Sequence, residues 1–483
     1  MPESDIVAAL RAAASRVPDR AALIGSSETL TYAELEGRAA AAAAYITDRA
    51  CGDIVGLFLP NTPAFAWTLL GALWAGKTVA VLPTLAPPPL LNLMAAEAGL
   101  ETVLTSSELL PRLAEAKATL LAVDELPSVA PRERPLASRP QAAAVLLYTS
   151  GTTGRPKAVA LSDQNILSNA EGCRQAAGFG SDEVMLAILP LFHAYGLTVT
   201  LTLPLMLGGS VVLQERFVPR TVLQAIERHR VTSLVAVPSQ YRLLAKEPAQ
   251  ADTASLWLCV AGAERLSEQV ARDFEARFDL PLFQGYGATE AAPVISMNSP
   301  LWYRPGTVGR PLPNLRDRLQ EDGRELPVGE TGEIWVEGPN VMLGYHNRPE
   351  ATAEKLVDAT LRTGDRGFLD ADSYLHLAGR ADDLIKVAGE KIYPAEVEHA
   401  LEQIDGVEEV AVVGVPDEKH GAVLRAFVQP RLGAALTEAG LRAACREHLE
   451  ASKIPRSFVL VEQLPCTAGG KVYKRSLAAH PSQ

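Results

Sequence analysis

Short apolar segments rich in β-branched residues alternate with amphipathic segments over most of the chain. Strand-like runs are predicted at residues 53–59, 78–82, 102–105, 143–148, 210–213 and 233–237. Helical periodicity falls between such runs, as where Val270, Phe274 and Phe278 recur on one face. Ser267 is suited to cap that helix. Because strands that alternate with helices pack as layers around a buried sheet, this pattern predicts an α/β fold.

The pattern changes after about residue 300, where Gly- and Pro-rich turns separate short strands and predict a small β-rich unit. A compact α+β region of about 100 residues is predicted to follow. Pro394 suits the first turn of a helix there. Strands are predicted at 409–415 and 423–429, and a helix at 436–449. We expect the boundary between the two regions near residues 379–383.

Acidic residues outnumber basic ones in this chain. Its 483 residues include 45 Lys and Arg against 57 Asp and Glu, for a formal net charge of −12. Affinity for nucleic acid or for anionic lipid comes mostly from Lys and Arg, so the charge balance disfavours both partners. The five cysteines include no C-x-x-C pair. This predicts a reduced, cytoplasmic chain without a zinc finger or a redox pair.

The stretch from Val184 to Gln214 contains no charged residue. A membrane-spanning helix needs about 20 apolar residues, so length alone would permit a span. Pro190, Pro204 and Gly208 interrupt the stretch, however, and no Lys/Arg cluster flanks it. The sequence therefore predicts a buried core segment and no integral membrane span.

Residues 148–157, YTSGTTGRPK, form a segment crowded with hydroxyls, glycines and one Lys, directly after an apolar strand. Glycines let backbone N–H groups approach a ligand, hydroxyls donate to oxyanions, and Lys supplies charge. This combination favours a phosphate-binding loop. It is not a Walker loop, because the spacing differs and Ala158 follows Lys157. The alternative is a polar hairpin loop.

Residues 284–290, QGYGATE, nearly match the dinucleotide fingerprint G-x-G-x-x-G, but Glu290 stands in place of the third Gly. A carboxylate at that point would repel a pyrophosphate unless a metal intervened. This departure also argues against a nucleotide-binding oxidoreductase, which needs the third Gly. By itself the segment is equally typical of a tight turn between a strand and a helix.

Two weaker segments lie nearer the C-terminus. Asp365 follows a Gly, and its carboxylate is able to accept two hydrogen bonds from ribose hydroxyls. Taken alone, a surface salt bridge between Asp365 and Arg380 is the favoured interpretation. Lys471 lies on a Gly-rich loop, which in isolation reads as a mobile tail.

Together these four segments resemble the AMP-forming acyl-activating enzymes, which include acyl-CoA synthetases, amino-acid adenylation domains and beetle luciferases. The resemblance covers nearly the whole chain, and the segments follow the family's order. It implies a large N-terminal adenylating domain, residues 1–381, with two βαβ-type subdomains and a small β-barrel at about 300–378. A small, mobile α+β C-terminal domain, residues 382–483, is expected to follow, with its hinge at Asp382.

The resemblance also implies a ligase reaction in two steps. A carboxylate attacks the α-phosphate of ATP to give acyl-AMP and pyrophosphate. A thiol, of CoA or of a phosphopantetheine arm on an acyl carrier protein, then displaces AMP. The expected cofactors and partners are therefore ATP, Mg²⁺, a small carboxylic acid and a thiol acceptor. A non-catalytic module would be expected to have lost Lys471 or Glu290, and both are present.

Residue roles follow from the same resemblance. The β- and γ-phosphates are expected to be bound by Thr149, Ser150, Gly151, Thr152, Thr153, Gly154 and Lys157. Glu290 and Thr152 are expected beside Mg²⁺, and Thr289 at the α-phosphate. Tyr286 and Gly287 are expected against the adenine. The segment Gly262, Ala263 and Glu264 is expected to line both the adenine site and the acyl tunnel.

Three further roles involve the C-terminal part of the chain. Asp365 and Arg380 are expected to hold the ribose. Lys471 is expected to neutralise charge at the reacting carboxylate and phosphate, and Gly389 to face the pantetheine. Cys466 and Gly470 depart from the Lys and Ser that the family more often carries before the final Lys.

Residues 189–196, LPLFHAYG, resemble the family's aromatic and His segment at the carboxylate site, which gives His193 a predicted catalytic role. The alternative is a hydrogen-bonded core His. Amino-acid adenylation domains carry an Asp there, and this chain has none. Residues 198–203 alternate as a strand would, but the resemblance implies a helix, which we predict.

The blocks GYGATEAAPVISMN, RPGTVGRPLP and GPNVMLGY are most similar to those of fatty-acyl-CoA and acyl-carrier-protein synthetases. With the uncharged stretch at 184–214, they predict a fatty or other apolar acid, and hence a role in fatty-acid metabolism. The alternative is an aryl or specialised-metabolite acid that is transferred to a carrier protein.

Overall fold

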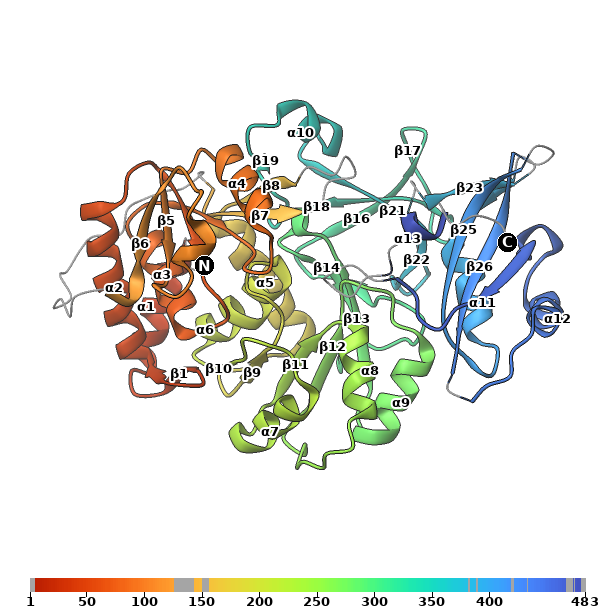
Figure 1. The fold of residues 1–483 in the computed structure, drawn as a ribbon, viewed down its shortest axis with the longest axis horizontal. Coiled ribbons are helices and arrows are strands. Elements are labelled where there is room, and N and C mark those ends of the chain that lie inside the picture. The colour runs from red at the N-terminus through yellow and green to blue at the C-terminus, as the bar shows by residue number, and fades with distance from the viewer. Residues whose placement is uncertain are drawn as a thin grey trace. The chain divides into compact units, whose positions relative to one another are not determined.

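The computed structural model describes residues 5–125, 143–149, 156–380, 383–387, 390–417, 421–431, 433–465, 472 and 474–478. The chain divides into two compact units. The first comprises residues 1–263, 274–317 and 336–362, and the second comprises residues 264–273, 318–335 and 363–483. The predicted α/β class, with a large N-terminal part and a small C-terminal one, is confirmed (Figure 1). The predicted boundary at residues 381–382 lies outside the described residues and stays a prediction.

One sheet of the first unit has seven strands in the order β19-β8-β7-β4-β3-β5-β6. They are β3 (Ile54–Phe58), β4 (Thr78–Val81), β5 (Thr102–Thr105), β6 (Thr119–Ala122), β7 (Val145–Thr149), β8 (Lys157–Leu161) and β19 (Gly344–Tyr345). The strands from β7 to β6 are parallel, whereas β8 and β19 add to the edge in antiparallel pairs. The edge strands therefore bring the end of the β7–β8 hairpin next to residues from far along the chain.

The second sheet of this unit has nine strands in the order β15-β14-β13-β12-β11-β9-β10-β1-β2. They are β1 (Ala21–Ile24), β2 (Thr29–Thr31), β9 (Val184–Ala187), β10 (Ser210–Leu213), β11 (Ser233–Ala236), β12 (Leu258–Ala261), β13 (Leu282–Gly287), β14 (Val294–Met297) and β15 (Arg310–Pro311). Its central strands, from β1 to β13, are parallel. Because parallel strands are usually buried on both faces, this explains their almost wholly apolar sequences.

Helices cover the sheets of the first unit. They are α1 (Ile6–Arg16), α2 (Tyr32–Arg49), α3 (Pro63–Trp74), α4 (Pro88–Glu97), α5 (Asp163–Ala177), α6 (Leu203–Leu207), α7 (Pro219–His229), α8 (Pro238–Lys246) and α10 (Pro349–Lys355). α2 packs on β1 and β2 of one sheet, and α3 packs on β3 and β4 of the other. Since α2 and α3 also pack on each other, this pair links the two sheets (Figure 1).

The helix α9 (Glu268–Phe278) confirms the pattern predicted at residues 267–278. The Ser267 hydroxyl accepts a hydrogen bond from the Val270 backbone N–H at 3.3 Å, as an N-cap does. Phe274 and Phe278 lie on one face, with ring centroids 4.6 Å apart.

The uncharged stretch from Val184 to Gln214 forms β9, a π-helix over Tyr195–Thr202, α6 and β10. Most of its residues are buried, so the prediction of a core segment is confirmed. Within the described part of the chain, no helix is both long and apolar enough to cross a membrane.

The helix predicted at residues 198–203 is also confirmed, against the local strand-like alternation. Two of its three threonines bond within the helix, whereas the buried Thr198 hydroxyl has no hydrogen-bond partner among the described residues. The Thr200 hydroxyl donates to the Gly196 carbonyl at 2.7 Å, and the Thr202 hydroxyl donates to the Leu197 carbonyl at 2.9 Å. Apolar and threonine positions are therefore buried alike.

The β-rich region after residue 300 contains a six-stranded sheet with the path β17-β16-β18-β21-β20, and β22 pairs with β21. The strands are β16 (Arg316–Glu321), β17 (Arg324–Glu325), β18 (Gly332–Glu337), β20 (Leu356–Val357), β21 (Thr360–Leu369) and β22 (Leu375–Arg380). The closed barrel that the resemblance implies stays a prediction.

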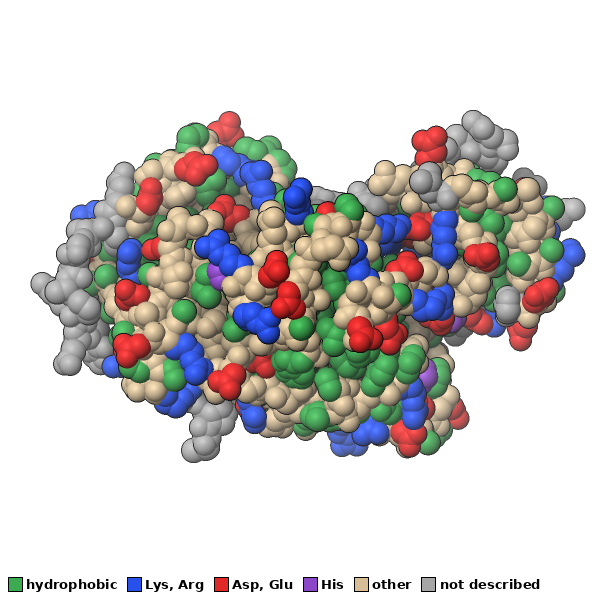
Figure 2. Space-filling view, turned by 90° about the horizontal axis from the view of Figure 1, so that it is seen from below, with side chains coloured by type: hydrophobic (Ala, Val, Ile, Leu, Met, Phe, Trp, Pro, Cys, Tyr) green, Lys and Arg blue, Asp and Glu red, His purple; other side chains and the backbone are tan. Residues whose placement is uncertain are grey.

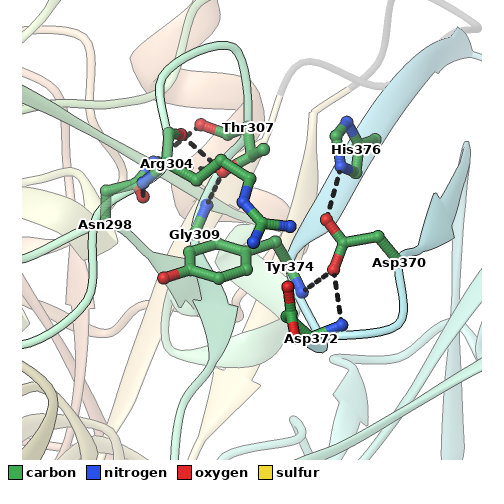
Figure 3. A network of polar contacts seen from close by, with 8 residues as sticks. All are labelled: Asn298, Arg304, Thr307, Gly309, Asp370, Asp372, Tyr374 and His376. Atoms are coloured by element: carbon green, nitrogen blue, oxygen red, sulfur yellow. Dashed lines mark hydrogen bonds and ion pairs between the residues drawn. The ribbon is translucent and has the colours of Figure 1, made fainter.

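Side chains hold the Gly- and Pro-rich turns in place. Between β14 and β15, the Asn298 amide accepts from the Arg304 backbone N–H at 2.9 Å and donates to the Thr307 carbonyl at 2.7 Å (Figure 3). In the second unit, the Asp370 carboxylate accepts from the backbone N–H groups of Asp372 and Tyr374, both at 3.0 Å (Figure 3). Such side-chain bonds fix turns that lack ladder hydrogen bonds of their own.

The C-terminal α+β region lies in the second unit. It contains β23 (Ile385–Val387), β24 (Glu390–Ile392), α11 (Pro394–Glu402), β25 (Val407–Asp417), β26 (Gly421–Pro430), α12 (Glu438–His448), β27 (Ser457–Leu460) and α13 (Lys474–Ala478). Pro394 stands in the first turn of α11, as predicted. Val397 and Leu401 on α11 pack in one apolar cluster with Val410 and Val412 on β25.

Charge on the surface is mixed in sign. On the face shown in Figure 2, acidic and basic side chains are interspersed rather than gathered by sign. Ion pairs such as Arg230 with Asp252, at 2.9 Å, join neighbouring charges at the surface.

Candidate active site

The end of the β7–β8 hairpin is where the predicted phosphate-binding loop begins and ends. Thr149 and Lys157 are directly paired across the two strands. Between them, Ser150, Gly151, Thr152, Thr153, Gly154 and Arg155 lie outside the described residues, and only Pro156 is described. The loop thus joins a hairpin, as the structural alternative required. The role of the loop in binding phosphate stays a prediction.

Three side chains from distant parts of the sequence meet beside this hairpin. The Lys157 ammonium lies 5.0 Å from the centroid of the Tyr345 ring. The Tyr345 hydroxyl donates a hydrogen bond to Oε1 of Glu290 at 2.7 Å. Tyr345 is held in place because β19 pairs with β8, which aligns Tyr345 with Val159. The structure therefore brings together Lys157 and Glu290, two residues predicted from separate segments.

The backbone around Glu290 is fixed by hydrogen bonds on both sides. Glu290 follows Thr289 in a short 3₁₀ turn, and its carbonyl accepts from the Met342 N–H at 2.8 Å. The amides of Asn169 and Asn340, both fully buried, donate to the Ala291 carbonyl at 3.1 and 2.7 Å. Because two segments that are far apart in the sequence hold this turn, the backbone that carries the half-buried Glu290 carboxylate is fixed.

The predicted adenine segments lie on neighbouring strands. β12 runs parallel to β13, with Ala261 aligned to Gln284, so Gly262 and Ala263 follow β12 beside the strand that carries Tyr286. Residues 284–287 belong to β13 itself rather than to a turn after it, which corrects the alternative weighed from sequence. Antiparallel pairing of Tyr286 with Ser296 extends the strand that far.

Gly287 and Gly262 are required by close contacts. A Cβ on Gly287 would lie 2.1 Å from the Pro293 carbonyl oxygen, so no other residue fits without moving the backbone. A Cβ on Gly262 would lie 2.6 Å from the Tyr195 ring, which therefore packs directly on this glycine. Tyr195 begins the π-helix, so this contact joins the predicted adenine segment to the predicted acid segment.

His193 lies in a segment that Asn61 holds. The buried Asn61 amide donates to the Leu189 carbonyl at 2.8 Å and accepts from the Leu191 N–H at 3.0 Å. The His193 ring packs beside Phe192, with centroids 4.6 Å apart, and remains accessible to solvent, so it is not a core histidine. Surrounding protein still desolvates the ring and lowers the pKa of His193, which keeps it neutral at pH 7.

Asp365 and Arg380 belong to the second unit and are aligned partners on β21 and β22. Arg380 Nε lies 3.6 Å from Oδ1 of Asp365, so the salt bridge weighed from sequence is present. The Asp365 N–H also donates to the Thr363 hydroxyl at 3.0 Å. Ribose binding by this pair stays a prediction, as does the role of the half-buried Glu264. Gly389, Asp382 and Lys471 lie outside the described residues.

Four residues that position this site were not assigned from the sequence: Asn61, Asn169, Asn340 and Tyr345. The block GPNVMLGY, which contains two of them, was the available signal. Buried asparagine amides with no charged partner typically serve to satisfy backbone groups.

The cluster of Lys157, Tyr345 and Glu290 is compatible with a bound magnesium ion, although Glu290 supplies its one carboxylate. Among the described residues, no group of three His, Cys, Asp or Glu side chains is placed to hold a metal ion. Mg²⁺ in phosphate-transfer sites is commonly bound by one or two carboxylates together with substrate phosphates and water. One carboxylate beside a predicted phosphate loop is compatible with that mode.

A cavity of about 400 Å³ lies elsewhere in the first unit. Its walls come from the β1–β2 turn, the end of β10 and one side of α7, and include Glu28, Gln214 and Arg228. No predicted site residue lines it.

The two comparisons of sequence agree with each other. The family profile described as "AMP-binding enzyme" matches residues 10–346, and "AMP-binding enzyme C-terminal domain" matches residues 396–471. The sulfoacetate–CoA ligase of Cupriavidus necator is 36% identical, over 99% of this chain and 98% of that protein. The long-chain-fatty-acid–CoA ligase of Bacillus subtilis is 32% identical, over 99% and 94%.

The comparison of structures points the same way. The O-succinylbenzoate coenzyme A synthetase of Bacillus subtilis, in complex with ATP and magnesium ion, superimposes with a TM-score of 0.87. It is 31% identical, with 97% of this chain and 98% of that chain covered.

Proposed function

This chain belongs to the AMP-binding enzyme family of acid–thiol ligases, and from that premise we propose that it joins an apolar carboxylic acid to the thiol of CoA at the expense of ATP. The proposal rests above all on the meeting of Lys157, Tyr345 and Glu290 at the ends of the Gly- and Thr-rich loop. A cation, a hydroxyl and a carboxylate at that point are the groups needed to bind a metal-complexed triphosphate.

The first half-reaction is an in-line displacement at phosphorus. A carboxylate oxygen of the acid attacks the α-phosphate of ATP, the bond to the bridging oxygen breaks, and pyrophosphate leaves. Lys157 and the loop that begins at Thr149 bind the leaving phosphates, and Thr289 contacts the α-phosphate. A bound Mg²⁺ would neutralise phosphate charge, and Glu290, whose carboxylate accepts a hydrogen bond from the Tyr345 hydroxyl, would hold it. Removing one donor to such developing charge typically costs about 10²–10³ in rate.

The second half-reaction transfers the acyl group. The thiol sulfur attacks the acyl-AMP carbonyl, the bond between carbonyl carbon and phosphate oxygen breaks, and AMP leaves. CoA is the proposed acceptor because the sulfoacetate and long-chain-fatty-acid relatives are both CoA ligases. Both ATP and CoA are abundant in the cytoplasm, which is the proposed location.

The character of the acid follows from the segment around His193. Leu189, Leu191 and Ala194 are buried, no charged residue occurs between Val184 and Gln214, and the desolvated His193 is neutral at pH 7. An ammonium group buried there would lack an anionic partner, at a cost of several kcal/mol. The relatives act on acids as different as sulfoacetate and long-chain fatty acids, so their names do not select one.

An aryl acid is the second candidate, and one observation favours it. The Tyr195 ring packs against Gly262, so an aromatic side chain lies where the acid and adenine segments meet. Aromatic rings gain about 0.5–1.5 kcal/mol from stacking beyond their burial.

Trapping acyl-AMP with hydroxylamine tests the proposal. We would measure kcat/KM for hydroxamate formation over straight-chain acids of increasing length, with benzoate, cinnamate, sulfoacetate and leucine alongside. Each added CH₂ contributes up to about 0.8 kcal/mol, and 1.4 kcal/mol corresponds to about tenfold, so the rate should rise with length and then break off. Leucine should be activated at least about 10³-fold less well than its deaminated analogue.

The same series separates the two candidates. If kcat/KM for an aryl acid is well above that for the best straight-chain acid, an aryl acid is the substrate. If kcat/KM is highest for sulfoacetate, or if leucine has the same kcat/KM as its deaminated analogue, the pocket is not apolar. No pyrophosphate release with any acid would contradict the ligase assignment itself.

A further inference from the structure

The segment before the predicted catalytic Lys471 is anchored in the second unit. Leu464 is buried in an apolar cluster with Val413 and Phe427. Its backbone N–H donates to the Gln429 side chain on β26 at 3.1 Å. Leu464 is seven residues from Lys471, and seven extended residues span up to about 25 Å. This anchor alone therefore leaves the position of Lys471 open.

The segment after Lys471 is anchored much closer to it. Helix α13 begins at Lys474, and Leu477 is buried in the same apolar cluster as Leu464. A helix of five residues is too short to be stable by itself, so tertiary contacts decide where it lies. Lys474 is three residues from Lys471, and three residues span at most about 11 Å. Whatever fixes Lys474 thus limits where Lys471 lies.

Lys474 is fixed by a buried carboxylate. Its ammonium lies 2.7 Å from Oε1 of Glu398 on α11. The same oxygen accepts a hydrogen bond from the Val412 N–H of β25 at 2.7 Å. The Glu398 side chain is only 8% exposed, so it is screened little by water. One carboxylate therefore ties α11, β25 and α13 together.

We propose that the Glu398–Lys474 ion pair is a positioning device for Lys471 in acyl-AMP formation. The inference rests on the proposed ligase function and on the role in acyl-AMP formation that the family resemblance predicts for Lys471. In this proposal, neither Glu398 nor Lys474 contacts the substrate. They hold the start of α13 so that the ammonium three residues earlier reaches the reacting carboxylate and phosphate. Misplacement of a reacting group by about 1 Å typically costs about 10²-fold in rate.

The test measures the two half-reactions separately in four variants. Lys474→Met and Glu398→Gln should each lower acyl-AMP formation, followed as hydroxamate, by roughly 10- to 100-fold. Conversion of supplied acyl-AMP to thioester should stay within about twofold, because that step does not use Lys471. Lys474→Arg, which keeps the charge, should restore most of the rate. The double variant should lose no more than either single one, as expected for a pair that acts as a unit.

Glu396→Gln is the matched control. Glu396 lies on the same helix, and its carboxylate pairs with Lys453 at 2.7 Å, but this pair does not involve the C-terminal segment. This variant should leave both half-reactions unchanged. Equal loss in Glu396→Gln, or parallel loss of both half-reactions in Lys474→Met with a lowered Tm, would reduce the Glu398–Lys474 pair to a general structural role and overturn the inference.

Lys471→Ala tells failure of the inference from failure of the proposed function. If Lys471→Ala abolishes acyl-AMP formation while Lys474→Met leaves it intact, the inference alone is wrong. If Lys471→Ala has no effect, the role proposed for Lys471 is wrong, and the inference falls with it. Because the Lys474 side chain is 33% exposed, Lys474→Met should fold even if Glu398→Gln does not.

Discussion

At the scale of single residues, Tyr345 serves two groups with one side chain. Its hydroxyl bonds the Glu290 carboxylate, and its ring faces the Lys157 ammonium. Tyr345 is only 6% exposed, so the ring keeps water from one side of both charges. Such a residue orients a carboxylate toward a cation without itself binding substrate.

Tyr345→Phe should therefore weaken the use of magnesium more than it weakens the fold. The variant keeps the ring and removes the hydroxyl that donates to Glu290. A hydrogen bond to a charged group is worth about 1.5–3 kcal/mol, or roughly 10- to 100-fold. We expect the Mg²⁺ concentration at half-maximal pyrophosphate release to rise within that range, with little change in Tm.

Tyr148→Phe supplies the control for this substitution. The Tyr148 hydroxyl, on the neighbouring strand β7, donates to the Met94 carbonyl at 2.9 Å rather than to Glu290. The magnesium dependence of Tyr148→Phe should match that of the unsubstituted chain. If the magnesium dependence of Tyr345→Phe also matched that of the unsubstituted chain, the Tyr345 hydroxyl would not be needed to orient Glu290.

Asp317 is the residue whose ionisation should most affect stability. Neither of its carboxylate oxygens reaches solvent or has a hydrogen-bond partner among the described residues, although other atoms of the residue are accessible. Burial raises the pKa of Asp317 from 3.8 to about 8. The folded chain thus keeps a proton that the unfolded chain releases, so the free energy of unfolding falls as the pH rises from about 4 to about 8.

Asp317→Asn should remove this loss, because the amide does not ionise. Thermal unfolding between pH 5 and pH 8 would show it as a Tm that falls less with pH than in the unsubstituted chain, with the largest gain at pH 8. Asp322→Asn, in the exposed turn after the same strand, is the control and should change nothing. Parallel pH profiles for Asp317→Asn and the unsubstituted chain would show that Asp317 is ionised in the folded state.

At the scale of elements, each of the six short apolar runs predicted as a strand is one, and two of them match to the residue. The strands predicted at 102–105 and 210–213 are β5 and β10. Their residues are all buried, so hydrophobicity and β propensity act in the same direction. Helix α9 and its Ser267 cap were predictable for the same reason, because a local pattern and a local hydrogen bond agree.

Elements that depend on distant partners were not predictable. Residues 284–287 read as a turn because nothing local shows that β14 pairs with them. The asparagines that hold the site act across more than 100 residues: Asn61 on Leu189 and Asn169 on Ala291. A single sequence does not reveal such contacts. The candidate site was therefore predicted as a set of segments, and its arrangement came from the structure.

The linker at Asp382 carries the prediction that belongs to this scale. A hinge residue must change φ and ψ between states, and Pro fixes φ near −65°. Asp382→Pro should leave pyrophosphate release within a few-fold and nearly abolish thioester formation, measured as acyl-CoA by chromatography. If both steps proceed at the unsubstituted rate, the domain turns about another residue.

At the scale of the whole molecule, the residues of the proposed reaction are divided between a large first unit and a small second one. The first unit contains Lys157, Tyr345, Glu290 and the acid segment around His193. The second unit contains the anchored C-terminal segment that follows Lys471. The central claim is that the acid is first joined to AMP and only then to the thiol.

Oxygen transfer from the acid tests that claim most directly. The chain would be given ATP, CoA and a straight-chain acid with both carboxylate oxygens labelled as ¹⁸O, and the AMP would be analysed by mass spectrometry. Attack of the carboxylate on the α-phosphate predicts one ¹⁸O in each AMP formed. Unlabelled AMP, or ADP and labelled phosphate in its place, would contradict the adenylate mechanism.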